Sequence, residues 1–109
     1  MSDSSEAEKP EMHAIERSET REVVAMVWRG GQEIDLDHGP ETHARVVVVE
    51  GNVTDEAFVR TRTGFRIVRR DLRAGDAVEI PAGSHHRFAC EGPAITVHEL
   101  RPGTRTSRF

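Results

Sequence analysis

The sequence has 109 residues, enough for one small domain, and only 36% of them are apolar. Its net charge of -4 lies entirely in residues 1–22, where seven acidic residues outnumber three basic ones, so residues 23–109 are neutral. A neutral domain without interleaved basic and aromatic residues argues against a nucleic-acid surface. No apolar run reaches about 18 residues and no secretory signal pattern is present, so we expect no membrane partner. The single cysteine, Cys90, allows no internal disulfide and favours the reducing cytoplasm.

Residues 1–18 are polar and lack periodicity, which predicts a disordered tail, and residues 102–109 read as a second loose tail. Between them, residues 19–101 form the expected domain. Short β-branched and apolar runs alternate there with glycine and proline turns, and no segment combines helical periodicity with caps. The runs predict strands over 22–28, 32–38, 43–49, 53–62, 65–70, 77–80, 86–90 and 94–100. This pattern predicts an all-β sandwich or barrel.

Alternation along these strands assigns side chains to the inside or the outside of the barrel. The expected interior positions are Leu36 with His38, Arg45 with Val47, His86 with Phe88 and Cys90, and Thr96 with His98 and Leu100. His43 begins the strand that carries Arg45 and shares its face. A single histidine on an apolar face is usually a satisfied core residue, whereas imidazole is also a common ligand of transition metals. Both interpretations stay open for each histidine taken alone.

Two glycine-bounded stretches resemble the two motifs of the cupin superfamily. The second motif, G-x5-P-x-G-x2-H-x3-N, is nearly complete in the stretch from Gly75 through Pro81 and Gly83 to His86, with Cys90 where the family often has asparagine. The resemblance implies a cupin fold, which is a double-stranded β-helix or small antiparallel, jelly-roll-like barrel, over about residues 24–101.

The first motif, G-x5-H-x-H-x3,4-E-x6-G, is altered. Leu36 stands at the first histidine position, His38 matches the second, and His43 stands at the usual glutamate position, before Gly51 closes the motif. Among cupins, the chain is most similar to the cysteine (thiol) dioxygenase type. The similarity lies in the runs Met26–Gly31, Leu36–Gly39, His86-Arg87-Phe88 and Thr96–Leu100.

That resemblance implies that His86 is a metal ligand. If His43 takes the place of the ligand that is missing at Leu36, then His38, His43 and His86 form a three-histidine metal face. The metal would be Fe(II) for an oxygenase, with Zn(II), Ni(II), Mn(II) and Co(II) as alternatives. His98 would support proton transfer as the catalytic residue. A small-molecule substrate would lie in a pocket lined by Leu36, Arg45, Val47, Phe88, Thr96 and Leu100. Arg45 and Arg21 are the candidates for binding a substrate carboxylate.

The expected function is therefore a metal-binding cupin, with a metal-dependent dioxygenase as the activity that the resemblance implies. Leu36 in place of a ligand favours one alternative, a non-catalytic cupin that senses or stores a ligand or metal. The other alternative is a metal-free isomerase or lyase that uses His86 and His98 as acid and base. The resemblance and the need to cover strand edges also predict a homodimer.

Two further features carry a simple and a functional interpretation. The arginines between residues 60 and 73 fit the solvated face of a hairpin, and could alternatively attract an anionic ligand or partner. Cys90 fits a small apolar core residue better than a reactive thiol.

Overall fold

A computed structural model of the chain describes residues 9–36 and 41–101. The described residues form the strands β1 (Glu11–Arg17), β2 (Glu22–Trp28), β3 (Gln32–Leu36), β4 (His43–Glu50), β5 (Asn52–Thr61), β6 (Gly64–Arg73), β7 (Ala77–Ile80), β8 (His85–Cys90) and β9 (Ala94–Arg101). No helix in this part of the chain is long and apolar enough to cross a membrane.

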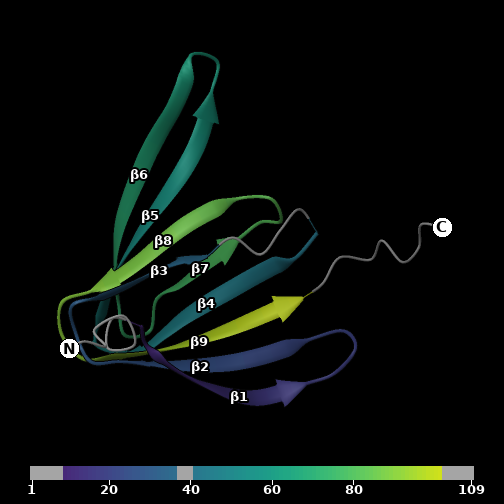
Figure 1. The fold of residues 1–109 in the computed structure, drawn as a ribbon, viewed down its shortest axis with the longest axis vertical. Coiled ribbons are helices and arrows are strands. Elements are labelled where there is room, and N and C mark those ends of the chain that lie inside the picture. Colours follow the sequence, from purple (N-terminus) through teal and green to yellow (C-terminus); the bar gives the residue numbers. More distant parts are fainter. Residues whose placement is uncertain (1–8, 37–40, 102–109) are drawn as a thin grey trace, which may run out of the picture.

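The strands build two antiparallel sheets with the orders β1-β2-β9-β4-β7 and β3-β8-β5-β6. Strands far apart in the sequence lie side by side, since β2 pairs with β9 and β3 pairs with β8 (Figure 1). The predicted all-β architecture is confirmed. His43 at the start of β4 lies opposite Arg101 at the end of β9, and Leu36 at the end of β3 lies opposite His86 near the start of β8.

The apolar core fills the space between the sheets. Trp28, Ile80 and Phe88 are each no more than 1% exposed, and an inward row of Ala44, Val46 and Val48 packs with them. The alternation predicted for β3, β8 and β9 is confirmed, because the positions expected inside are buried or partly buried on all three strands.

The face predicted for β4 is wrong. Arg45 is exposed and Val47 is only partly buried, whereas Ala44, Val46 and Val48 point inward. The run of four valines offers no alternation from which the inner face could be read. Pairing with β7 decides it, because Ala44 lies opposite the buried Ile80 and Arg45 lies opposite Glu79. A shift of one residue turns every side chain of a strand to the other face.

The predicted disordered tail differs from the structure at residues 11–17, which form β1. This strand pairs with β2 from Glu11 opposite Val27 to Arg17 opposite Glu22. Every residue of β1 is exposed, including Met12 and Ile15. Backbone hydrogen bonds to the edge of β2 hold this strand, and its side chains stay exposed. Its composition is therefore as polar as that of an unfolded segment, which is why no strand was predicted here.

The hairpin of β5 and β6 projects beyond the other strands (Figure 1). Leu72 is the only buried residue of β6, and the apolar side chains of Val59, Phe65, Ile67 and Val68 are exposed. The predicted hairpin is confirmed, with β6 continuing to Arg73. The homodimer expected from the sequence stays a prediction.

Candidate functional site

The strongest candidate site lies at the end of the barrel where β3 ends and β8 begins. Leu36, the last described residue of β3, lies directly opposite His86, the second residue of β8. The alternation of β8 turns His86 inward, and its side chain is only 6% exposed. An imidazole in such a place needs hydrogen-bond partners, which identify how it is held.

Asp55 on β5 is the partner of His86. Its carboxylate is fully buried, and its Oδ1 atom lies 2.7 Å from Nδ1 of His86. Arg70 on β6 donates to the other carboxylate oxygen, with 3.2 Å between Nη2 and Oδ2. A guanidinium, a buried carboxylate and an imidazole therefore form one chain across β6, β5 and β8. Because the Arg70 side chain is half-exposed, this chain connects solvent to the interior.

Neither Asp55 nor Arg70 was predicted from the sequence. A signal for Asp55 was present, because an acid occurs among Val53, Ala57 and Val59, which share one face of β5. Its partner could not be inferred, since Arg70 lies 15 residues away on a hairpin whose register fixes the pair.

His98 is held by a second buried network on the opposite sheet. Its Nε2 lies 2.8 Å from the Thr96 hydroxyl, which also accepts a hydrogen bond of 2.9 Å from Nε1 of Trp28. The ring centroids of His98 on β9 and Phe88 on β8 are 6.1 Å apart. Because β9 and β8 belong to different sheets, this contact joins the two sheets across the core. The predicted inward position of His98 is confirmed, and the hydroxyl and indole hold its ring in place.

His43 lies outside the barrel, away from His86. Its side chain is 47% exposed, and its Nε2 lies 2.7 Å from Oε1 of Glu79. Arg45 binds the other carboxylate oxygen of Glu79 at 3.3 Å. The predicted inward direction of His43 and Arg45 is thus wrong, for the reason given for β4. Neither residue contacts the interior where His86 and His98 lie.

This outer face carries a network of ion pairs. Glu99 accepts from Arg101 at 2.9 Å and from Arg21 at 3.3 Å. The hydrogen bond from Arg101 is the main cause that lowers the pKa of Glu99. Arg21, the other arginine considered for a substrate carboxylate, is therefore also committed to the outside of the sheet, where it binds Glu16 as well.

The remaining predicted pocket residues divide into two groups. Leu36, Phe88 and Thr96 are at most 3% exposed and belong to the packed interior rather than to the wall of an open pocket. Leu100 is partly buried at the end of β9 and packs against the core. Val47 lies on the outer face with Arg45.

The predicted three-histidine metal face is not formed by the described residues. His38 lies outside the described residues, and His43 points away from His86. Within residues 9–36 and 41–101, no three histidine, cysteine, aspartate or glutamate side chains lie close enough together to hold a metal ion. The described donor set at His86 is one imidazole supported by one carboxylate, which does not by itself fit a divalent transition metal.

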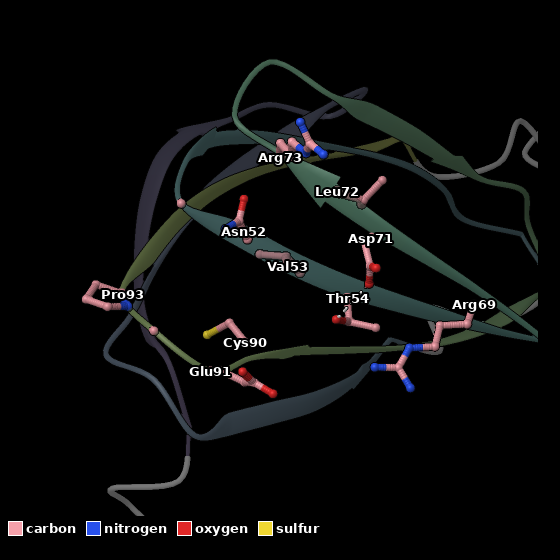
Figure 2. Close-up of a pocket in the computed structure, with 12 residues that line it drawn as sticks. Asn52, Val53, Thr54, Arg69, Asp71, Leu72, Arg73, Cys90, Glu91 and Pro93 are labelled. Carbon is pink, nitrogen blue, oxygen red and sulfur yellow. Dashed lines mark hydrogen bonds between the residues drawn. The ribbon is translucent and has the colours of Figure 1, made fainter.

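A groove of 690 Å³ lies at the opposite end of β8 (Figure 2). Asn52 and Thr54 of β5, Arg69 and Asp71 of β6, and Glu91 line it, and the figure shows acidic and basic groups distributed around it. With two acids beside its arginines and no inward histidine, this groove has a mixed charge and offers no clear acid–base group.

Cys90 borders this groove but is 5% exposed. Burial raises the pKa of its thiol, so the thiolate fraction at neutral pH is lower than for a free cysteine. We therefore expect slow labelling of the folded protein by an aromatic disulfide reagent at pH 7 and rapid labelling in urea, measured by absorbance. Labelling that is equally fast in both conditions would contradict the assignment of Cys90 as an apolar core residue.

Comparisons with known proteins identify the architecture. No family model matches the sequence, and no curated protein matches it. An RmlC-like cupin protein from Desulfovibrio desulfuricans superposes with a TM-score of 0.66 at 19% identity, covering 89% of this chain and 86% of that one. The chain has the cupin fold.

Two further solved structures share this fold. KdgF from Halomonas sp. gives a TM-score of 0.70 at 15% identity, covering 88% of this chain and 82% of that chain. An oxalate oxidase superposes with a TM-score of 0.73 at 14% identity, covering 93% of this chain and 55% of that chain. These likenesses show the fold alone, so the thiol dioxygenase type and its metal stay predictions.

Proposed function

We propose that this cupin binds a small molecule at the end of the barrel where β3 ends and β8 begins, and uses His86 as a general acid and base. The buried chain of Arg70, Asp55 and His86 is the observation that carries the proposal. A fully buried carboxylate with both oxygens engaged by an imidazole and a guanidinium fixes the orientation of the imidazole. This choice takes up the metal-free alternative named from the sequence.

The chemistry follows from the two nitrogens of the imidazole. Asp55 accepts a hydrogen bond from Nδ1–H, which leaves Nε2 of the neutral ring as the proton acceptor. When Nε2 takes a proton from a ligand, the carboxylate stabilises the imidazolium that forms. Arg70 donates a hydrogen bond to the second carboxylate oxygen of Asp55 and is a positioning residue, as is Asp55 itself. The same Nε2–H can return the proton to the ligand, as an isomerase or lyase requires.

His98 lies on the facing sheet and is the second titratable ring of the interior. Its contact with Phe88, which follows His86 by two residues on β8, places it deeper than His86. A hydrogen bond with Thr96 restricts it, and we assign it to shaping and polarising the inner end of the site.

Exchange of carbon-bound protons tests the proposal directly. Pyruvate and pyruvamide would be incubated with the protein in D2O, and loss of the methyl proton signal would be followed by NMR. His86 Nε2 would take the proton, exchange it with solvent, and return a deuteron to the same carbon. We expect His86→Gln to slow exchange by about 100-fold or more. The exposed His43→Gln is the matched control and should exchange like the wild type.

Equal exchange rates for wild type, His86→Gln and protein-free solution would reject the acid–base role. Circular dichroism of each variant distinguishes this result from unfolding. Asp55→Asn supplies a further comparison, since it preserves shape while removing the acceptor that orients His86.

The metal-dependent dioxygenase is the second candidate. One observation favours it, because a histidine whose Nδ1 meets a carboxylate is the usual arrangement behind a metal ligand, with Nε2 left to bind. Its further ligands would have to include His38. Titration of untagged protein with Fe(II) and Zn(II) should then show binding that His38→Gln and His86→Gln both abolish and His43→Gln preserves. Oxygen uptake with small thiols tests the activity, and no binding in wild type would reject this candidate.

A further inference from the structure

The inner face of the β5–β6 hairpin continues from the Asp55–His86 pair toward the hairpin tip. In the register of β5 and β6, Asp55 lies opposite Arg70 and Val59 lies opposite Arg66. Residues that lie opposite one another in an antiparallel pair point to the same face. Since Asp55 is buried against His86, Arg66 and Arg70 are both on the face that continues the barrel interior.

The surface between these two arginines is apolar. Ala57 lies opposite Val68 on the hairpin and opposite His86 on the other side, so one row runs from His86 through Ala57 to Val68. Ala57 is partly buried, and Val59 and Val68 are each 36% exposed. An imidazole therefore stands at one end of an apolar strip, and Arg66 lies two residues from Val68 at the other end, on the side away from the Asp55–Arg70 pair.

The two arginines differ in their partners. Arg70 is bound to Asp55 at 3.2 Å. Among the described residues, no carboxylate lies within ion-pair distance of Arg66. On the outer face of the same hairpin, by contrast, Arg60 stacks over the Phe65 ring at 5.6 Å from its centroid. Arg66 is thus a cation on the site side of the hairpin with its charge uncompensated by the described residues.

The spacing suits a small ligand. From His86 on β8, the register passes over Ala57 on β5 to Val68 on β6, and Arg66 lies two residues from Val68 along β6. The spacings between strands and between residues place the Cα atoms of His86 and Arg66 about 12 Å apart. Both side chains stand on the same face of the sheet, so a molecule of a few carbon atoms would bridge their ends across Ala57 and Val68. A guanidinium presents paired donors that match a carboxylate, and such a bidentate contact also fixes orientation.

We infer that the ligand of this site is a small organic carboxylate whose carboxylate binds Arg66 and whose carbon chain lies over Ala57 and Val68. This inference rests on the proposed function, because it places the carbon atoms of the ligand toward Nε2 of His86. Arg66 thus takes the carboxylate-binding role that was expected for Arg45 or Arg21. Arg70 neutralises Asp55 and so prevents that carboxylate from repelling the anion.

Binding of matched anions and neutral molecules tests the inference. Pyruvate and succinate, with pyruvamide and succinamide as neutral counterparts, would be titrated into the full-length protein while amide resonances are followed by NMR. We expect both carboxylates to shift Ala57 and Val68, with weaker binding at higher salt, and the amides to leave them unchanged. Arg66→Gln should raise Kd about tenfold or more, and Arg66→Lys should retain part of the affinity.

The control is Arg69→Gln, which removes the same charge from the outer face of the same strand and should leave Kd unchanged. If Arg69→Gln weakens binding as much as Arg66→Gln does, the attraction is general and the assignment of Arg66 is overturned. Carboxylates that shift neither Ala57 nor Val68 at millimolar concentration also overturn it.

The proton-exchange measurement keeps the two proposals separate. Exchange that depends on His86 without carboxylate binding at Arg66 overturns this inference and leaves the acid–base role in place. Carboxylate binding that depends on Arg66 without exchange leaves this inference in place and overturns only the acid–base role.

Discussion

Replacing Asp55 with alanine should lower the free energy of unfolding by about 3 kcal/mol, measured by urea denaturation at pH 7. The substitution leaves Nδ1 of the buried His86 without its acceptor at 2.7 Å, and it removes the anion that binds Arg70. The loss at His86 is costly because its side chain is only 6% exposed and water cannot replace the missing acceptor, whereas water can hydrate the half-exposed Arg70.

The neighbouring Asp71→Ala is the matched control for that change. Asp71 lies on the outer face of the same hairpin and accepts one long, exposed hydrogen bond of 3.4 Å from Thr54. Its removal should change stability by less than about 0.5 kcal/mol. Similar losses for the two variants would show that Asp55 contributes no more than a surface carboxylate and that the buried chain does not hold His86.

Gly51→Ala should destabilise the fold by about 3 kcal/mol or more, since a left-handed backbone and a steric overlap act together. Gly51 has a φ of +84° in the turn between β4 and β5, which L-residues rarely adopt. An added Cβ would lie 2.4 Å from the carbonyl oxygen of Pro93 and 2.8 Å from Cα of Ala94. These are backbone atoms of Pro93, in the turn before β9, and of Ala94, the first residue of β9, so relief would require this backbone to shift.

Gly75→Ala separates the two causes. Gly75 has a similar φ of +98°, but a Cβ there would have no neighbour within 4 Å. It should therefore cost only the backbone preference, about 1–2 kcal/mol. The difference in midpoint between the two variants in urea measures the overlap at Gly51. Equal midpoints would show that the turn yields without disturbing β9.

The all-β fold could be predicted because β3, β8 and β9 alternate clearly between inward and outward residues. Leu36, Phe88 and His98 lie on strands in which inward and outward residues alternate, so their inward direction could be predicted. The turns could also be predicted, since Gly51 directly follows β4 and Gly64 is the first residue of β6. The segment before β2 was not, because β1 is held by backbone pairing and buries none of its side chains.

The candidate site was only partly predictable, since His86 and His98 were placed inside but their partners were not. His43 was expected beside His86, whereas pairing of β4 with β7 turns it outward to Glu79. A uniform valine run carries no information on direction, and the motif resemblance fixed positions along the chain without fixing the face. The register of β5 with β8, in which Ala57 lies opposite His86, places Asp55 beside His86.

The sequence by itself determined an all-β chain with a histidine facing inward near the start of β8. Only the tertiary structure decided which groups meet that histidine: Asp55 and Arg70 from a hairpin, with Arg66 further along the same face and His43 outside. The physical reason is that alternation is a local property, set by two neighbouring residues along a strand. Cross-strand partners depend on register between distant strands, and a shift of one residue there exchanges the inside for the outside.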